Sequence, residues 1–308
     1  MSNLRQEFAD KMLAVGASDP RLVVMVGDIS HGILKPFAAE YPDRYYNVGI
    51  CEPTIVGMAA GVASTGLIPV AHTIAPFLIE RSFEQIKLDF AYQQLAGNFI
   101  TVGGAFDYAQ LGCSHHCYND VSLMCQLDNT VVTSPASAYE FSTLFSQCYD
   151  QGSINYFKLT ENPHSFDLTG KIELGKAVII EQGSDITLIA VGPQLKQASR
   201  ACATLKAQGH SVELLYIHTI KPFDAETVIQ SISKTKAVIV CEELSQHGGV
   251  YDLVMRHWAS RDKAQFKQMA INNMIHDYGT YDELCQVAGL TDDNIVMHAN
   301  TLIENKKV

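Results

Sequence analysis

The stretch 47-NVGICEPTIVGMAAGVAS-64 places one carboxylate, Glu52, at the start of a segment built almost wholly from Gly, Ala, Val, Ile and Met. The residues before it are typical of a short strand, and Pro53 favours the first turn of a helix, so Glu52 is predicted to lie at a strand-to-helix junction. Gly57 and Gly61 are four residues apart and share one face of that helix. Because each glycine costs roughly 1 kcal/mol of helix propensity relative to alanine, we expect close packing to compensate and the helix to be buried.

Two interpretations of Glu52 follow from this placement. A carboxylate at the edge of a buried apolar helix loses hydration, which favours its protonated form and lets it share or give a proton near neutral pH. Alternatively, Glu52 is a first-turn acid that only complements the positive end of the helix dipole. The stretch alone favours neither interpretation.

Length and charge limit the classes of protein to consider. The 308 residues suggest two domains, each large enough for its own core. The net charge of -11, with no cluster of Lys or Arg, argues against a nucleic-acid surface. The first twenty residues read as an amphipathic helix containing acids, not as a signal peptide, and the apolar runs are too short for a membrane span. We therefore expect a soluble, cytoplasmic protein that binds neither nucleic acid nor membrane.

The eight cysteines have no paired spacing and fit reduced thiols better than a disulfide framework. The cluster 113-CSHHC-117 brings two Cys and two His into five residues. Four ligands so crowded cannot all wrap one tetrahedral zinc ion. No metal site is expected in this chain, and the histidines need another explanation.

Strand-like and helix-like segments alternate through the first half of the chain. This alternation predicts an α/β fold with a doubly wound, mostly parallel sheet, helices on both faces, and ligands at the carboxyl ends of the strands. Glu52 lies at such an end. Besides the strand and helix around Glu52, strands are expected near 22–27, 68–73, 98–103, 130–133 and 154–159, and helices near 3–16, 32–40, 79–95, 115–126 and 137–150.

The pattern lapses around 160-TENPHSFDLTGK-171, which is rich in turn-forming residues and predicts a linker. A second α/β domain follows. Its strands are expected near 176–181, 186–191, 211–216, 236–240 and 268–272, and its helices near 194–208, 224–232, 249–259 and 282–288. The predicted organisation is a first domain over 1–162, a linker over 163–174 and a second domain over 175–308.

Several motifs together resemble one family. The runs 46-YNVGICEPTIVGMAAGVASTGLIPVAHTIAPF-77, 81-RSFEQI-86 and 112-GCSHHCYNDVSLM-124 resemble the pyrimidine-binding domain of transketolases. The runs 190-AVGP-193, 218-HTIKP-222 and 242-EELSQHGGVYD-252 resemble the transketolase C-terminal domain. The resemblance covers nearly the whole chain, and the motifs keep their order and approximate spacing.

The resemblance implies thiamine diphosphate as cofactor and gives Glu52 a role. In this family a glutamate hydrogen-bonds the far ring nitrogen of the aminopyrimidine, whose imino form then removes the reactive proton of the cofactor itself. Glu52 matches that glutamate, and Phe77 matches the phenylalanine that stacks on the pyrimidine, with an ordinary core aromatic as the alternative. Asp28 and Ile50 are expected beside the cofactor, although a turn-forming role explains Asp28 equally well.

His115 matches the family histidine that contacts the oxygens of the donor, where a neutral imidazole donates to a developing alkoxide and takes the proton back. His116 stands where the family usually has Gln. The expected substrate-facing residues are Ser30, His31, Gln110 and His116.

Departures from the family pattern concern the sugar phosphate. The His and Arg that hold the phosphate in ordinary transketolases are replaced by Gly103 and by Thr160 or Glu161, and Leu111 stands in place of an acid. Since bidentate Arg is the usual device for phosphate, we expect a donor whose terminal phosphate is replaced by a sulfonate or by nothing. Lys158, His164 or a residue of a partner chain are the candidates for a replacement charge.

No GDG motif occurs, although the family uses GDG and a later Asn to hold Mg²⁺ against the diphosphate. The simplest account is a split enzyme whose partner, an N-terminal transketolase-like subunit, carries GDG and the Mg²⁺ ligands. Pyrimidine domains of the family also pair with each other, and the glycine-rich helix after Glu52 suits that contact, so an α2β2 heterotetramer is expected.

The resulting hypothesis is a subunit that transfers a two-carbon ketol unit from a ketose to an aldehyde. One alternative is the β-type subunit of a 2-oxo acid decarboxylating or acyloin-forming thiamine enzyme, which has the same two-domain layout. A second alternative is a non-catalytic regulatory subunit that has kept the fold.

Overall fold

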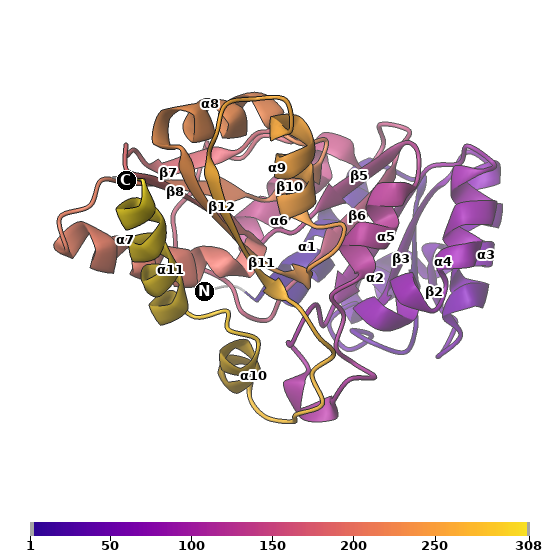
Figure 1. Ribbon diagram of the computed structural model, residues 1–308. Coiled ribbons are helices and arrows are strands. Elements are labelled where there is room, and N and C mark those ends of the chain that lie inside the picture. The colour runs from indigo at the N-terminus through magenta and orange to yellow at the C-terminus, as the bar shows by residue number, and fades with distance from the viewer. Residues whose placement is uncertain (1–2, 307–308) are drawn as a thin grey trace.

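Two sheets organise the chain in the computed structural model, which describes residues 3–306 (Figure 1). The first sheet has the order β10-β5-β6-β4-β3-β1-β2, and all its neighbours are parallel except β10 and β5. Its strands are β1 (Leu22–Val26), β2 (Tyr45–Asn47), β3 (Ile68–Ile74), β4 (Gly97–Val102), β5 (Thr130–Thr133), β6 (Ile154–Lys158) and β10 (Thr219–Lys221).

Helices cover both faces of this sheet, so its central strands are buried throughout and read as continuous apolar runs such as 22-LVVMV-26. The α-helices of this half are α1 (Leu4–Ser18), α2 (Lys35–Glu40), α3 (Glu52–Ser64), α4 (Phe83–Gln85), α5 (Asp120–Gln126) and α6 (Ala138–Cys148). Helical segments of the 3-10 or π type are η1 (Pro42–Arg44), η2 (Pro76–Glu80), η3 (Ile86–Ala91) and η4 (Ala109–Leu111).

The second sheet has the order β12-β11-β8-β9-β7, parallel except for β7 against β9. Its strands are β7 (Val178–Glu181), β8 (Ile186–Val191), β9 (Val212–Ile217), β11 (Ala237–Ser245) and β12 (Gln265–Ile271). The surrounding helices are η5 (Gly192–Gln194), α7 (Leu195–Ala207), α8 (Ala225–Thr235), α9 (Val250–Trp258), α10 (Tyr281–Val287) and α11 (Asp292–Asn305). The prediction of two α/β domains with mostly parallel sheets is confirmed.

The long helix expected near 79–95 is wrong in detail. The chain there forms η2, α4 and η3 in succession, and η2 and η3 are π-helical. Bonds such as Arg81 N to the Pro76 carbonyl, 3.0 Å, span five residues and accommodate one extra residue per turn. This change of helix type determines the directions of the Phe77 and Arg81 side chains. The helix expected from 115 likewise begins only at Asp120, so the CSHHC cluster lies in a loop.

The helix α3 is buried on one face only. Ile55, Val56 and Ala59 pack into the core, whereas Gly57 and Gly61 are exposed. The expectation that close packing covers the glycine face is therefore not met within one protomer. The helix lies at the end of the molecule away from the second sheet (Figure 1), which leaves that face open.

Sequence reasoning missed β10 and α11. The strand β10 belongs by sequence to the second half but pairs antiparallel with β5 at the edge of the first sheet. Lys221 at its end donates to the carbonyls of Cys125, 3.3 Å, and Leu127, 2.6 Å, at the C-terminal end of α5. The two halves are thus joined through the first sheet itself.

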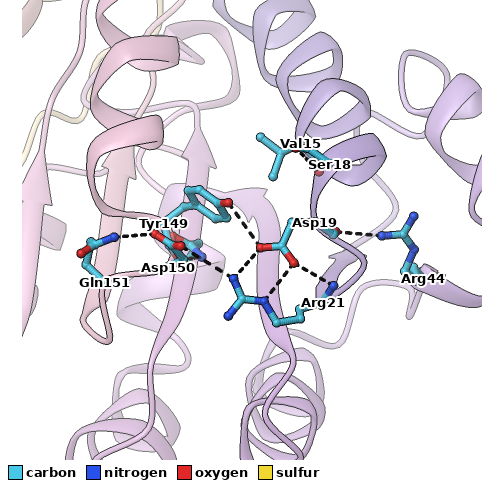
Figure 2. A network of polar contacts seen from close by, with 9 residues as sticks. Val15, Ser18, Asp19, Arg21, Arg44, Tyr149, Asp150 and Gln151 are labelled. Carbon is cyan, nitrogen blue, oxygen red and sulfur yellow. Dashed lines mark hydrogen bonds and ion pairs between the residues drawn. The ribbon is translucent and has the colours of Figure 1, made fainter.

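A charged network around Asp19 fixes the exit of α1 (Figure 2). The Asp19 carboxylate accepts two bonds from the Arg21 guanidinium, 2.9 and 2.7 Å, and one from the Tyr149 hydroxyl, 3.3 Å. The hydrogen bond from Arg21 lowers the pKa of Asp19 to about 2. Arg44 donates to the carbonyls of Asp19 and Gly16, 3.0 and 2.9 Å, and so caps the end of α1.

Among the described residues, no helix has both the length and the apolar character that crossing a membrane requires.

Candidate active site

The residues predicted for the site come from loops that leave the carboxyl ends of neighbouring strands. The strands β6, β4, β3, β1 and β2 lie side by side and run parallel, so their carboxyl ends form one edge. Ligands of doubly wound sheets bind at this edge. Ile50 and Glu52 follow β2, and Asp28, Ser30 and His31 follow β1. Phe77 follows β3, Gln110, His115 and His116 follow β4, and residues 159–162 follow β6.

Glu52 is the first residue of α3 and only 1% exposed. Its carboxylate accepts a hydrogen bond from Arg81 Nη1 at 2.9 Å. Arg81 follows η2, in the loop after β3, so the partner of Glu52 comes from a neighbouring loop and not from its own helix. This contact supports a role for Glu52 at the edge of the sheet beyond complementing a helix dipole.

Arg81 joins three of the predicted site residues. Besides its bond to Glu52, its guanidinium lies over the Phe77 ring, 4.2 Å from the centroid. The Phe77 ring in turn meets the His115 ring edge-to-face at 5.1 Å between centroids. Burial, and then the positive charge of Arg81, lower the pKa of His115. The imidazole is thereby kept neutral near pH 7, which is the form that both donates and accepts a proton.

Sequence reasoning gave Arg81 no role, although Arg81 begins the motif 81-RSFEQI-86. The available signal was that Arg81 is the single cation of this motif. Its position against Glu52 depends on the π-helical turn η2, which no periodicity in the sequence indicates.

Asp28 lies in the turn after β1 and is exposed. It has a positive φ of 56°, a conformation that Asp tolerates better than most residues. Its backbone N–H donates to Asn47 Oδ1, 3.0 Å, and its carboxylate accepts from Asn47 Nδ2, 3.1 Å. The turn-forming interpretation of Asp28 therefore has structural support, and Asp28 is exposed in the loop after β1.

Ser30 is buried, and its hydroxyl already has two partners. His72 Nδ1 donates to the Ile100 carbonyl, 2.8 Å, so His72 Nε2 must accept the Ser30 hydroxyl proton, 2.9 Å. The Ser30 oxygen accepts from Arg5 Nη2, 3.2 Å. Ser30 thus positions Arg5, a residue of α1 that sequence reasoning did not consider.

The remaining substrate candidates divide by exposure. His31 and Gln110 are exposed at the edge, as is Ile50. His116 is buried against Phe106, with 5.4 Å between ring centroids, and neither of its ring nitrogens has a hydrogen-bond partner. His116 is therefore buried and does not face the open edge.

Neither Lys158 nor His164 is free to hold a substrate anion. Lys158 is buried and paired with Asp120, 2.8 Å between Nζ and Oδ1. His164 is buried and donates through Nε2 to Glu140 Oε1, 2.5 Å. Both residues serve as internal partners, so the expectation that they supply a replacement charge is wrong.

At Gly103, where ordinary transketolases have a histidine, the fold leaves no room for a side chain. Gly103 has a φ of 74°, and a Cβ at this position would lie 2.3 Å from the ring of Tyr108. The Tyr108 ring fills the space that a side chain there would need. The same ring lies 6.4 Å from that of His115, centroid to centroid.

The donor set fits one half of thiamine diphosphate. A buried carboxylate acceptor at Glu52 and the aromatic ring of Phe77, one face of which carries the Arg81 guanidinium, suit a flat heterocycle with ring nitrogens and an amino group. The residues that the structure describes contain no group of three or more His, Cys, Asp or Glu placed to hold a metal ion.

Comparisons with known proteins identify the family. The model of the transketolase pyrimidine-binding domain matches residues 1–159, and that of the transketolase C-terminal domain matches residues 175–295. A 6-deoxy-6-sulfo-D-fructose transketolase subunit of Clostridium sp. (strain MSTE9) is 29% identical over 306 residues, 98% of this chain and 95% of that protein. A subunit of the apulose-4-phosphate transketolase of Actinobacillus succinogenes is 31% identical over 260 residues, 82% of this chain and 84% of that one.

A solved structure, a split-gene transketolase in an inactive beta4 tetramer, is similar with a TM-score of 0.90 and 26% identity over 99% of both chains. The chain belongs to the transketolase family.

Proposed function

We propose that this chain is one subunit of a two-chain, thiamine diphosphate-dependent transketolase that moves a two-carbon ketol unit from a ketose to an aldehyde. The observation that carries the proposal is the convergence of Glu52, Phe77 and His115 on one edge, joined by Arg81. Two relatives that match along most of the chain are named as transketolase subunits, which supports the same activity.

Glu52, Phe77 and His115 each have a defined task in this proposal. Glu52 holds a ring nitrogen of the aminopyrimidine with its buried carboxylate, and Phe77 packs on the ring face. The bound cofactor supplies a nucleophilic carbon and stabilises the negative charge that bond cleavage leaves. His115, neutral near pH 7, donates a hydrogen bond to the substrate oxygen on which charge develops and receives a proton from the hydroxyl that reacts.

The diphosphate and its Mg²⁺ are assigned to a partner chain. This chain lacks the GDG motif, and the similar split-gene structure is named as inactive in its tetramer of one chain type. The partner is proposed to be an N-terminal transketolase-like subunit that carries GDG.

Self-association is proposed through the open face of α3. Gly57 and Gly61 expose backbone there, and a Cβ at Gly61 would meet nothing within 4 Å. Beside them lies a groove of about 510 Å³ with a mostly apolar lining that includes Met25, Tyr46, Met58, Val62 and Leu67. With the partner chain, this contact leads to an α2β2 assembly.

A second candidate function rests on Arg81. A guanidinium about half exposed, beside Phe77 and His115, suits the carboxylate of a 2-oxo acid, as a β-type subunit of a decarboxylating or acyloin-forming thiamine enzyme would need. The two candidates differ in product. A 2-oxo acid donor releases CO₂, whereas a ketose donor releases a shortened aldose.

The first experiment separates these candidates. Thiamine diphosphate with Mg²⁺ is titrated calorimetrically into the chain alone and into its mixture with the GDG-bearing subunit. Binding in the mixture only, followed by ketose consumption without CO₂, is the expected result. Tight binding to the chain alone contradicts the split site, and binding in neither sample supports a regulatory subunit.

Glu52→Gln in the complex tests the mechanism, with Glu84→Gln, an exposed acid on α4, as the matched control. The amide cannot share its proton with the ring nitrogen, so turnover is expected to fall by at least about 100-fold while assembly is retained. Turnover comparable to that of the control contradicts the role of Glu52.

A further inference from the structure

A second group of charged side chains lies on the same edge beyond His115. Tyr108, whose ring neighbours His115, also lies near Glu161, in the segment after β6, and near Arg5 of α1. Arg5 Nη1 lies 3.5 Å from Glu161 Oε1, and Arg5 Nη2 donates to Ser30 Oγ at 3.2 Å. The Arg5 and Glu161 side chains are 28% and 38% exposed, so a ligand can reach them.

Charge at this edge is balanced pair by pair. Arg5 pairs with Glu161, Arg81 with Glu52, and Lys158 with Asp120. Asp107, in the loop after β4, adds a further carboxyl. Burial raises the pKa of Asp107 to about 7, so it is partly ionised at neutral pH. A phosphate or sulfonate at Arg5 would lie against the Glu161 carboxylate, which is 3.5 Å from Arg5 Nη1.

The cavity beside Tyr108 is lined by groups that suit an uncharged, hydroxylated ligand. The Tyr108 ring occupies the space beside Gly103 and lines a cavity of about 420 Å³ together with Asp107, Gln110, Thr280 and Tyr281. Amide, hydroxyl and carboxyl groups are the partners of sugar hydroxyls, because each hydroxyl both donates and accepts. The paired guanidinium and carboxylate of Arg5 and Glu161 offer both functions at one point.

We infer that Arg5, Glu161 and Ser30 form the subsite for the distal end of the donor, and that this end is an uncharged, hydroxylated carbon chain, as in an unphosphorylated ketose. The inference rests on the proposed function and specifies its substrate class. In it, Arg5 donates to the distal hydroxyls, Glu161 accepts from them, and Ser30 holds Arg5 in place.

The test compares donors that differ only at the distal end: D-fructose, D-fructose 6-phosphate and 6-deoxy-6-sulfo-D-fructose. Initial rates are measured with the complete two-chain complex and one aldehyde acceptor. The kcat/KM for D-fructose is expected to exceed that for either anionic donor by about tenfold or more, because an anion next to Glu161 meets a like charge. A preference for the phosphate or the sulfonate overturns the assignment.

Two variants assign the effect to the subsite. Glu161→Gln is expected to reduce the preference for the uncharged donor about tenfold or more, whereas Glu304→Gln, which removes an exposed acid of α11, leaves that preference as in the parent. Arg5→Lys keeps the positive charge but loses the planar, two-pronged donor group of the guanidinium. This variant is expected to raise KM for D-fructose with little change in kcat. An unchanged preference in Glu161→Gln contradicts the inference.

Failure of the proposed function gives a different pattern. If the complex binds the cofactor but consumes none of the three donors, saturation-transfer NMR of D-fructose and its phosphate on the same complex still tests the subsite. Transfer to D-fructose that Glu161→Gln abolishes supports the inference without turnover. Equal transfer in the parent and in Glu161→Gln overturns it.

Discussion

Arg81 is the residue through which the cofactor side and the substrate side of the site influence each other. Its positive charge opposes protonation of His115, so Arg81→Met is expected to raise the pKa of His115. The pKa stays below its ordinary value because burial, the larger cause, remains. NMR titration of His115 measures the shift, with Arg200→Met, an exposed arginine of α7, as control.

The same variant predicts a change in the pH profile of the complex. Since the neutral imidazole is the active form, the acid limb of kcat/KM should move to higher pH in Arg81→Met. An unmoved titration of His115 contradicts the electrostatic coupling, whatever the rates do.

Asp19 offers a residue-scale prediction of stability. Its pKa of about 2 lies below its ordinary value of 3.8, so the folded state gains stability from the ionised form above pH 3.8 and loses it as the pH falls toward 2. Because Arg21 is half exposed, Asp19→Asn is expected to cost only about 1 kcal/mol at pH 7. Urea unfolding of both proteins at pH 7 and pH 3.5 checks this. The difference should shrink at the lower pH, and a constant difference argues against the ion pair.

Among the helices and strands, α3 has a glycine face that is exposed in one protomer. Gly61→Arg should prevent self-association, because a long cation would project from the contact face. Gly61→Ala is the control for helix stability and should raise the free energy of unfolding of a dissociated protomer by about 1 kcal/mol. Light scattering after size exclusion reports the mass. An unchanged mass for Gly61→Arg places the contact elsewhere.

Helices and strands could be predicted where the hydrophobic pattern of the sequence matches their burial. Contacts between residues of different loops could not be predicted. The strands around 22–26, 98–102 and 186–191 carry apolar runs that leave little choice, and the motif around Glu52 indicated its place at the carboxyl edge. Arg5 and Arg81 reach the edge through an N-terminal helix and a π-helical turn. Their partners lie far away in sequence, so no local pattern could reveal these contacts.

At the scale of the whole molecule, the two sheets are coupled by polar contacts that a two-domain division does not anticipate. The strand β10 leaves the second half to pair with β5, and it is too short to give a strand signal of its own. Nearby, Glu140 of α6 accepts from His164 of the connecting segment and from Tyr216 of β9. One buried carboxylate thus links both halves and the chain between them.

Tyr216→Phe tests that link. The hydroxyl donates to Glu140 Oε2 at 2.6 Å, and its removal leaves a buried carboxylate with one donor fewer, at a cost of about 1–3 kcal/mol. The remaining bonds from Ala136, Ser137 and His164 should keep the protein folded. Tyr92→Phe, on an exposed side chain, is the control and should cost less than about 0.5 kcal/mol.

Fluorescence of Trp258, the single tryptophan, reports the second half during urea unfolding, and far-UV circular dichroism reports the whole chain. If Glu140 couples the halves, the two signals coincide in the parent, and Tyr216→Phe moves the fluorescence transition to lower urea ahead of the dichroism. Transitions that stay superimposed at the parent midpoint would mean that the apolar core and β10 alone join the two sheets.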